Sequence, residues 1–422
     1  MPKQRRKKEM KGTRGITLLA LIITIIVLLI LAAVTILTLT GENGILTNAK
    51  NAKKQTIQKT IEEKERIYRM EYEIANGDID LRDDDQEEYQ YLKGFITKWK
   101  VNEGETITLP IQKLDHLIYD FTVDYGDGTI NKITDVTENV THTYKKAGEY
   151  EVTIEGICQT FSFPKIPESK DKIVGIKQWG ATGFKDLSFS GCSNLAGEIP
   201  IPVKNSFKEV ESFNGLFHSC SKLTGKIPAN LFYHAPKAVA FWGAFLNCYN
   251  LTGTIPENLF KHYTNIVNVS SLFQGCTNIT GEIPPNLFKG HLVRNANVIS
   301  IFRGCGITKI PANLFEGVDV IDLAFTFAGT NIEEIPEDLL ANFPNLEKLA
   351  YTFSGCQNLK SIPPNLFRNN SKINYFGYTF SQCINLEGIV PELWNIYPLA
   401  DGNRCFSGCP KIENRVDNEC FL

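Results

Sequence analysis

The sequence lacks the short motifs on which most catalytic sites are built. Its 422 residues contain no Gly-x-Ser-x-Gly, His-Glu-x-x-His, Gly-x-x-x-x-Gly-Lys or Gly-x-Gly-x-x-Gly pattern. These patterns support serine nucleophiles, zinc hydrolysis, nucleotide binding and dinucleotide binding. Histidine occurs only six times, and Cys-x-x-Cys pairs, which begin most structural zinc sites, are missing. We therefore expect a protein that is not an enzyme, with no cofactor and no metal.

A basic surface is lacking as well, apart from the first fourteen residues. The chain has 44 Lys and Arg against 47 Asp and Glu, and residues 1–14 hold seven of the basic residues and one acid. The remainder therefore has 37 basic and 46 acidic residues, a formal charge of −9. Because a nucleic-acid-binding surface must neutralise phosphates, this balance argues against nucleic acid as a partner.

The sequence is rich instead in one repeated phrase: Phe, any residue, a small residue that is usually Gly, and Cys. Successive fourth positions lie 25 to 29 residues apart. Self-similarity at this period is typical of a solenoid, in which each unit buries its apolar face only against its neighbours. The period is too short for two long helices per repeat. The nine copies begin at Phe189, Phe217, Phe245, Phe273, Phe302, Phe327, Phe353, Phe380 and Phe406.

Eight of the eleven cysteines occupy the fourth position of these copies. Stacked strands lie roughly 4.7–4.9 Å apart with parallel side chains, whereas a disulfide needs converging Cβ atoms. The sixth copy has Thr330 in this place, so we predict a ladder of small buried side chains. Disulfides stay as the alternative, including a Cys405–Cys420 pair near the end.

Most copies continue into a Leu-Thr-Gly-x-Ile-Pro-x-Asn-Leu-Phe segment, as from Leu223 to Phe232. The alternation predicts a short strand with Leu and Ile inward and Thr outward, ended by Pro. The Pro-x-Asn-Leu-Phe part predicts a turn or a short helix that returns Leu and Phe to the core.

The aromatic-x-small-Cys-x-x-Leu pattern resembles the leucine-rich-repeat bacterial surface proteins called BspA-like. The resemblance implies a solenoid of about eight to nine repeats over residues 188–409. It also implies an N-terminal cap over 165–187 and a C-terminal cap over 410–422. Relatives of this kind are surface adhesion and matrix-interaction proteins, so the resemblance implies a binding function.

The outward strand positions form the predicted binding face. They carry hydroxyl groups and charges of both signs, and no aromatic side chain on which a sugar ring stacks. A protein or peptide ligand is therefore favoured. The alternative is a solvated face without a ligand, since Thr residues also pack across strands. The residues of this face are Thr224, Lys226, Thr252, Thr254, Thr280, Glu282, Thr308, Lys309, Glu333, Glu334 and Lys360.

The front of the chain has the composition of a membrane anchor. Seven basic residues precede 24 uncharged residues, Ile16–Leu39, which are enough to span a bilayer as a helix. The basic flank predicts a cytoplasmic N-terminus, with the chain after residue 40 outside the cell. We predict a basic leader over 1–15 and a transmembrane helix over 16–39. A cleaved secretory signal is the alternative, although its apolar region is usually shorter.

The run from Lys11 through Gly15 and Ile16 to Ala20 resembles the N-termini of bacterial type IV pilins and pseudopilins. The resemblance implies cleavage between Gly15 and Ile16 by a prepilin peptidase. Members of that family carry Glu at the fifth mature position, and this chain has Ala20. That difference argues against assembly into a pilus.

Two further segments precede the repeats. Residues 45–76 are rich in Lys, Glu and Gln, with Ile and Met spaced roughly as one helical face, which predicts an amphipathic stalk helix. Residues 77–94 contain seven acids between Asp78 and Glu88, which predicts a solvated linker because a folded core does not bury such a run.

Residues 95–164 alternate polar and apolar side chains in short runs and predict a small all-β domain. The turn Val123-Asp-Tyr-Gly-Asp-Gly-Thr129 and the later His-Thr-Tyr144 and Gly-Glu-Tyr150 segments resemble PKD domains. Those are immunoglobulin-like β-sandwiches of extracellular proteins. The resemblance implies a spacer without chemistry of its own.

Two groups of residues raise the question of a metal. Asp124 and Asp127 lie in the turn, but a calcium loop of the EF-hand type needs more acids and a closing Glu. A simple turn is favoured, since Asp caps its own turn and Gly accepts positive φ. His234, His262 and His291 are predicted to stack as a column without a fourth ligand, and solvated polar positions are favoured over zinc.

Together these features predict a membrane-anchored bacterial cell-surface protein whose solenoid binds an extracellular protein ligand. A pilin-like structural subunit or accessory of a type IV pilus or secretion assembly is the alternative. An accessory domain of an enzyme is a remote alternative.

Overall fold

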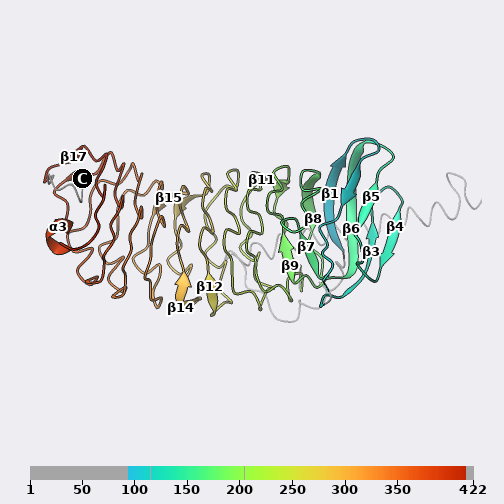
Figure 1. Ribbon diagram of the computed structural model, residues 1–422, viewed down its shortest axis with the longest axis horizontal. Coiled ribbons are helices and arrows are strands. Elements are labelled where there is room, and N and C mark those ends of the chain that lie inside the picture. The colour runs from blue at the N-terminus through green and yellow to red at the C-terminus, as the bar shows by residue number, and fades with distance from the viewer. Residues whose placement is uncertain (1–93, 115, 204, 415–422) are drawn as a thin grey trace, which may run out of the picture. The chain divides into compact units, whose positions relative to one another are not determined.

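The computed structural model describes residues 94–114, 116–203 and 205–414, which are coloured in Figure 1. They belong to one compact unit of the chain. The predicted leader with its Gly15–Ile16 bond, the transmembrane helix and the stalk lie outside the described residues, as does all of the acidic linker except Gly94. None of the described ranges contains a helix with the length and apolar character that a membrane crossing requires.

A small β domain begins the described chain and confirms the predicted all-β fold. β1, β3, β4 and β6 form one antiparallel sheet in the order β4-β3-β6-β1, and β2 pairs separately with β5. In β1, Phe95 and Trp99 are fully buried while Lys98 and Lys100 are exposed, as alternation across a pleat requires. The strands are β1 (Phe95–Val101), β2 (Thr106–Thr108), β3 (Tyr119–Asp124), β4 (Ile130–Ile133), β5 (Thr141–Thr143) and β6 (Gly148–Cys158).

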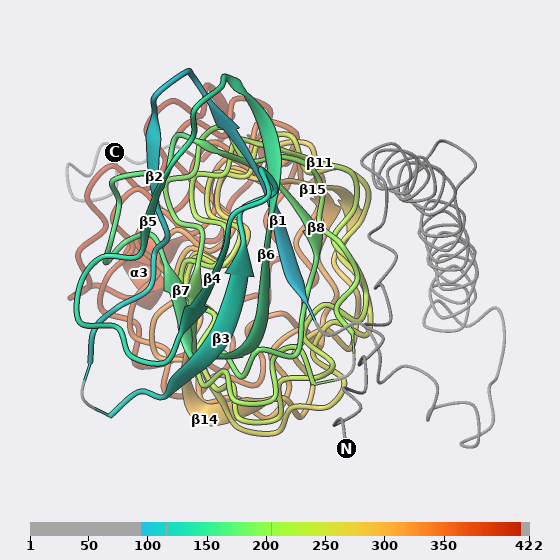
Figure 2. The same ribbon diagram turned by 90° about the vertical axis from the view of Figure 1, so that its right-hand side faces the viewer.

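The strands after β6 join the β domain to the solenoid. β7 (Thr160–Ser162) pairs in parallel with β9 (Asp186–Ser188), while β8 (Ile173–Gln178) returns to pair antiparallel with β1. The ring of Phe161 contacts both Phe95 and Phe189, with centroids 5.0 and 5.7 Å apart. One hydrophobic core therefore runs from the β domain into the first repeats. Figure 2 shows the β domain in front of the stacked turns.

The remaining chain is a β-solenoid, which confirms the repeat architecture predicted from the sequence (Figure 1). Its strands are short and pair in parallel from turn to turn, and α3 (Leu393–Ile396) is the single helix of the described ranges. The strands are β10 (Ala196–Glu198), β11 (Lys222–Thr224), β12 (Ile266–Asn268), β13 (Thr280–Glu282), β14 (Leu292–Asn297), β15 (Gly306–Lys309), β16 (Glu387–Gly388) and β17 (Lys411–Ile412).

The repeat phenylalanines stack along the inside of the solenoid. From Phe189 to Phe406, rings on successive turns lie nearly parallel, with centroids 5.5–6.1 Å apart. Such pairs contribute about 0.5–1.5 kcal/mol each beyond the burial of their area. The phenylalanine column therefore holds the turns in register.

The small third residue of the motif has a conformational reason. At this position the backbone is left-handed in all nine copies, with φ between 60° and 82°. Glycine adopts this conformation without the penalty that a Cβ brings. At Gly275 an added Cβ would also lie 2.6 Å from the side-chain oxygen of Asn247 on the preceding turn.

The predicted cysteine ladder is present. None of the ten described cysteines forms a disulfide, and all ten are buried. The Sγ atom of Cys276 donates to the carbonyl oxygen of Phe245 on the preceding turn at 3.0 Å, and five other repeat cysteines make the same contact at 3.0–3.1 Å. Thr330 fills the gap, but its hydroxyl donates within its own turn, to Phe327 at 2.7 Å. Cys420 lies outside the described residues.

The strand segments are shorter than the Leu-Thr-Gly-x-Ile alternation predicts. β11 ends at Thr224 because Gly225 has a φ of +75° and leaves the extended region. Leu223 and Ile227 nevertheless both point inward and are 2% exposed. The predicted sidedness is correct, while the continuous strand is not.

The buried thiols predict a loss of stability at alkaline pH. Burial raises the pKa of eight cysteines, to about 11 for Cys356 and about 12 for Cys305. An unfolded thiol ionises near pH 8.5. Because the folded pKa is higher, each thiol's stabilising contribution is complete below about pH 8.5 and is lost as the pH rises above it.

The free energy of unfolding should therefore fall between about pH 9 and pH 10, by roughly 1 kcal/mol for each fully buried thiol. Urea unfolding followed by circular dichroism at a series of pH values measures this slope. Replacing Cys220, Cys248 and Cys276 together by Ala should make this pH-dependent loss of stability smaller by the contribution of three thiols. An unchanged slope in this variant would show that the thiols do not cause it.

Candidate functional site

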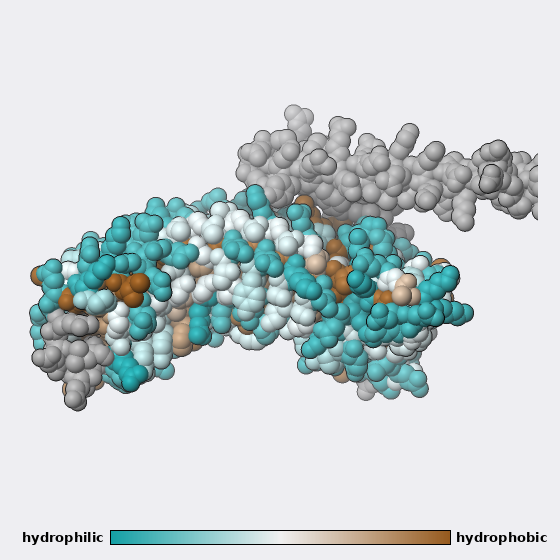
Figure 3. Space-filling view, turned by 90° about the horizontal axis from the view of Figure 1, so that it is seen from above, coloured by the Kyte–Doolittle hydropathy of each residue, from teal (hydrophilic) through white to brown (hydrophobic). Residues whose placement is uncertain are grey.

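The eleven residues of the predicted binding face are all exposed and lie along one side of the solenoid. Backbone bonds connect them from turn to turn: the amides of Thr252 and Thr280 donate to the carbonyls of Gly225 and Gly253 at 2.8 and 2.9 Å. β10 pairs with β11 and β13 with β15 in the same column. We call these eleven residues the ribbon. It follows the side of β11 and β15, uppermost in Figure 1, and Figure 3 looks onto that side.

The ribbon carries three lysines and three glutamates among its hydroxyl groups. Its early turns present hydroxyl groups and Lys226, and Thr252 already donates its own hydroxyl to Gly225 at 3.2 Å. In the middle, Lys309 and Glu282 form an ion pair of 3.6 Å in which both side chains are about half exposed. Glu333 follows and makes no ion pair with another described residue. The surface therefore offers hydrogen-bonding groups and charges of both signs, which suits an extended polar ligand.

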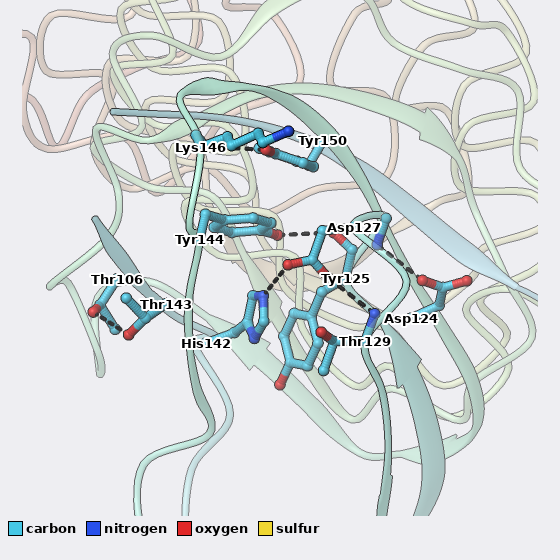
Figure 4. A network of polar contacts seen from close by, with 11 residues as sticks. Thr106, Asp124, Tyr125, Asp127, Thr129, His142, Thr143, Tyr144, Lys146 and Tyr150 are labelled. Carbon is cyan, nitrogen blue, oxygen red and sulfur yellow. Dashed lines mark hydrogen bonds and ion pairs between the residues drawn. The ribbon is translucent and has the colours of Figure 1, made fainter. Parts of the chain in front are cut away.

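A second group of polar residues lies in the β domain, where Figure 4 shows it. The Nε2 atom of His142 lies 2.8 Å from Oδ2 of Asp127, and the His142 ring stacks on Tyr125 with centroids 4.1 Å apart. The hydroxyl of Tyr144 donates to the backbone carbonyl of Tyr125 at 3.0 Å, and Tyr144 stacks on Tyr150 at 4.1 Å. The motif residues found in the sequence therefore form one packed cluster between the turn and the β5–β6 edge.

The two aspartates of this turn are engaged by the turn itself. Oδ1 of Asp124 accepts the backbone N–H of Gly126 at 2.8 Å, and Oδ1 of Asp127 accepts that of Thr129 at 3.0 Å. This is the capping geometry of the simple turn favoured from the sequence. Gly126 has a φ of +78°, and a Cβ there would lie 2.6 Å from the Glu151 carbonyl oxygen.

The pKa of Asp127 is lowered by these contacts. Burial by itself raises the pKa of this carboxyl, but the hydrogen bonds from His142 and Thr129 outweigh it. Burial raises the pKa of Tyr125 to about 12, and that of Tyr144 further. The cluster thus holds one anionic carboxylate among neutral phenols, an arrangement that stabilises the turn.

The predicted histidine column is interleaved with tyrosines. The Tyr233 ring lies 4.8 Å from His234 and 4.1 Å from His262, measured between centroids. Nδ1 of His291 lies 2.7 Å from the carbonyl oxygen of Tyr263. Burial, Lys261 and His291 lower the pKa of His262. In the part of the chain that the structure describes, no three His, Cys, Asp or Glu side chains are arranged to hold a metal ion.

Sequence reasoning missed a third group, a column of aromatic side chains two residues before the repeat phenylalanines. Phe325, Tyr351 and Tyr378 lie on successive turns, half-buried, with parallel rings whose centroids are 4.6 and 4.5 Å apart. Arg303 and Arg404 lie at the two ends of the column. The three aromatic residues each lie two positions before the Phe of their repeat copy, and this shared offset was the sequence signal that could have revealed the column.

Comparison with known families finds a match to the β domain that includes the cluster around Asp127 and His142. A family model described as "PKD domain" matches residues 95–156. The match confirms the predicted PKD-like domain and ends before the solenoid begins. A search of curated proteins finds no match to the chain.

The contacts of Asp127 predict an acid-sensitive β domain. Asp127→Asn should lower the free energy of local unfolding by about 1–2 kcal/mol at neutral pH, because a charge-assisted hydrogen bond is lost. The folded pKa is lowered, so the carboxylate's contribution is complete above about pH 4 and is lost as the pH falls through the folded pKa. Wild type and variant should therefore converge at acid pH.

Hydrogen-exchange mass spectrometry of residues 123–150 measures this effect. Asp120→Asn is the matched control, because the Asp120–Lys132 ion pair is exposed and such pairs contribute little. Equal protection of both variants at every pH would contradict the role of Asp127.

Proposed function

We propose that this chain is a membrane-anchored bacterial cell-surface protein of the BspA-like leucine-rich-repeat kind, whose solenoid binds extracellular protein ligands. The ribbon is the observation that carries the proposal. Eleven exposed side chains lie along one side of a stack of turns, and backbone hydrogen bonds connect these turns to one another. Solenoid surfaces of this type are extended binding surfaces.

The remainder of the chain supplies the anchor in this proposal. Ile16–Leu39 spans the cell membrane with the N-terminus in the cytoplasm, and everything after residue 40 is extracellular. The PKD-like domain is the spacer between anchor and solenoid. Because β8 and β1 pair and the core is continuous, the spacer holds the solenoid in a fixed orientation to itself.

A pilin-like structural subunit is the second candidate, favoured by the leader and the Gly15–Ile16 sequence that a prepilin peptidase would cut. The two candidates differ in one observable. A pilus subunit is recovered in filaments sheared from the cell, whereas an anchored binding protein stays with the membrane fraction.

Disrupting the ribbon should abolish ligand capture. Thr252→Arg and Thr280→Arg each place a long charged side chain on the exposed column without touching the core, so the fold should be kept. Wild-type full-length chain, incubated with extracellular matrix extract, should retain a protein that the two variants retain at least ten-fold less. Thr264→Arg, an exposed residue off the ribbon, is the control. Equal capture by all variants would place binding elsewhere.

Topology is tested separately. External protease added to intact cells should remove the solenoid, detected with an antibody against residues 188–409, while a cytoplasmic marker protein survives. Sequencing of the N-terminus of the membrane-bound fragment should give Ile16 if the leader is cleaved and Met1 if it is retained. Full protection of the solenoid would contradict the extracellular orientation.

A further inference from the structure

The aromatic column occupies a position that carries small residues on the earlier turns of the solenoid. Two residues before each repeat phenylalanine, the backbone is left-handed on eight turns, with φ between 54° and 62°. The earlier turns fill this position with Gly or Ser, and the later ones with bulky side chains. The eight residues are Gly215, Gly243, Ser271, Ser300, Phe325, Tyr351, Tyr378 and Arg404.

Bulky residues at this position are strained. Gly adopts a φ between 54° and 62° without the penalty that a Cβ brings. The earlier turns carry Gly or Ser here, so the repeat itself does not require an aromatic residue at this position. The solenoid backbone therefore does not by itself explain the column.

The geometry of the column determines which chemistry it offers. Rings of Phe325, Tyr351 and Tyr378 lie within 7° of parallel, so they cover each other's faces. The guanidinium carbon of Arg303 lies 4.5 Å from the centre of the Phe325 ring, and that of Arg404 lies 5.8 Å from that of Tyr378. A ligand therefore meets ring edges, two phenol hydroxyls and two cationic groups.

The two arginines differ from the other described ones in their partners. Arg294 is paired with Asp319 at 3.4 Å, and Arg368 is paired with Asp338. Arg303 and Arg404 are exposed, and neither forms an ion pair with another described residue. Arg404 donates to the hydroxyl of Tyr378 at 3.3 Å. The column therefore ends in two cations that a carboxylate can reach.

We propose that Arg303, Phe325, Tyr351, Tyr378 and Arg404 bind an extended acidic segment of a partner protein. Tyr and Arg are among the side chains most enriched at the centres of protein interfaces. The arginines are separated by four turns, roughly 19 Å at 4.7–4.9 Å per turn, which is about six residues of an extended peptide. Carboxylates accept bidentate bonds from guanidinium groups, and the phenol hydroxyls donate between them.

An acidic polysaccharide fits this surface less well. Sugar rings bind aromatic side chains by stacking on their faces, and here neighbouring rings or guanidinium groups cover every face. The proposal goes beyond the ribbon and does not depend on it, because the column lies before the repeat phenylalanine and the ribbon lies after the repeat cysteine in each turn.

The test uses full-length chain, purified in a nonionic detergent, and fluorescence anisotropy at about 0.15 M salt, where distant charges are screened. The probe is a fluorescein-labelled dodecapeptide of alternating Glu and Gly. Its counterpart of alternating Gln and Gly reports binding without charge, and labelled oligogalacturonate reports an acidic glycan. Wild type should bind the Glu peptide at least ten-fold more tightly than either of the other probes.

Three variants locate the binding. The double variant R303Q/R404Q should weaken binding of the Glu peptide at least ten-fold. The matched control R294Q/R368Q removes the same charge from the paired arginines and should change the affinity less than two-fold. Tyr351→Gly should also weaken binding, and the fold should be kept because Gly adopts the φ of +55° at this position without penalty.

Several outcomes would overturn the proposal. The first is that wild type does not bind the Glu peptide. The second is that both arginine double variants lose the same affinity, which would show that binding depends on net charge alone. Tighter binding of oligogalacturonate would assign the column to a glycan. A Tyr351→Gly variant with unchanged affinity and a lowered unfolding midpoint would make the column structural. None of these results bears on ligand capture by the ribbon.

Discussion

Each turn of the solenoid buries its apolar side only by lying on the next turn, and the stacked phenylalanine rings are the contact on which this depends. From Phe189 to Phe406, the ring centroids of neighbouring turns lie 5.5–6.1 Å apart. Because the rings lie at the same place in every turn, they also set the register of the backbone. Every other column of the solenoid repeats with the phenylalanines.

The polar groups beside this column form hydrogen bonds with the preceding turn, and the same bond recurs from turn to turn. Thiols such as Cys276 donate to a phenylalanine carbonyl of the preceding turn. The Asn two residues after the Cys does likewise, as Asn250 donates to Ser221 at 2.8 Å and Asn278 to Tyr249 at 2.9 Å. Backbone carbonyls inside and at the surface of the stack thereby find donors, although the strands are only two to six residues long. This explains why a fold with little regular strand remains ordered.

The two proposed binding surfaces consist of side chains that take no part in the inner stack. The ribbon consists of exposed positions between inward Leu and Ile residues, and the aromatic column lies where the backbone would accept Gly. Both surfaces are held on the same rigid stack, and the β domain is joined to it through β7 and β8. In both proposals the ligand would meet a preorganised array, and preorganisation lowers the entropic cost of binding.

The sequence by itself determined the solenoid, its period, its buried phenylalanines and thiols, the exposure of the ribbon and the PKD-like turn. Each of these follows from local patterns: repeats at 25–29 residues, alternation within a few positions, and a turn whose glycines and aspartates define its own geometry. Residue identity and short-range spacing carry enough information for such features.

Only the tertiary structure decided which distant residues meet. Phe325, Tyr351 and Tyr378 are about 26 residues apart and become one stack only when the register of the turns is known. Likewise, the pairing of β8 with β1 depends on which strand edges the rest of the fold leaves open. The shared repeat offset places the three rings in one column, but their parallel contact depends on the backbone path of neighbouring turns, and the β8–β1 pairing depends on which strand edges lie side by side. Local residue spacing does not encode either of these.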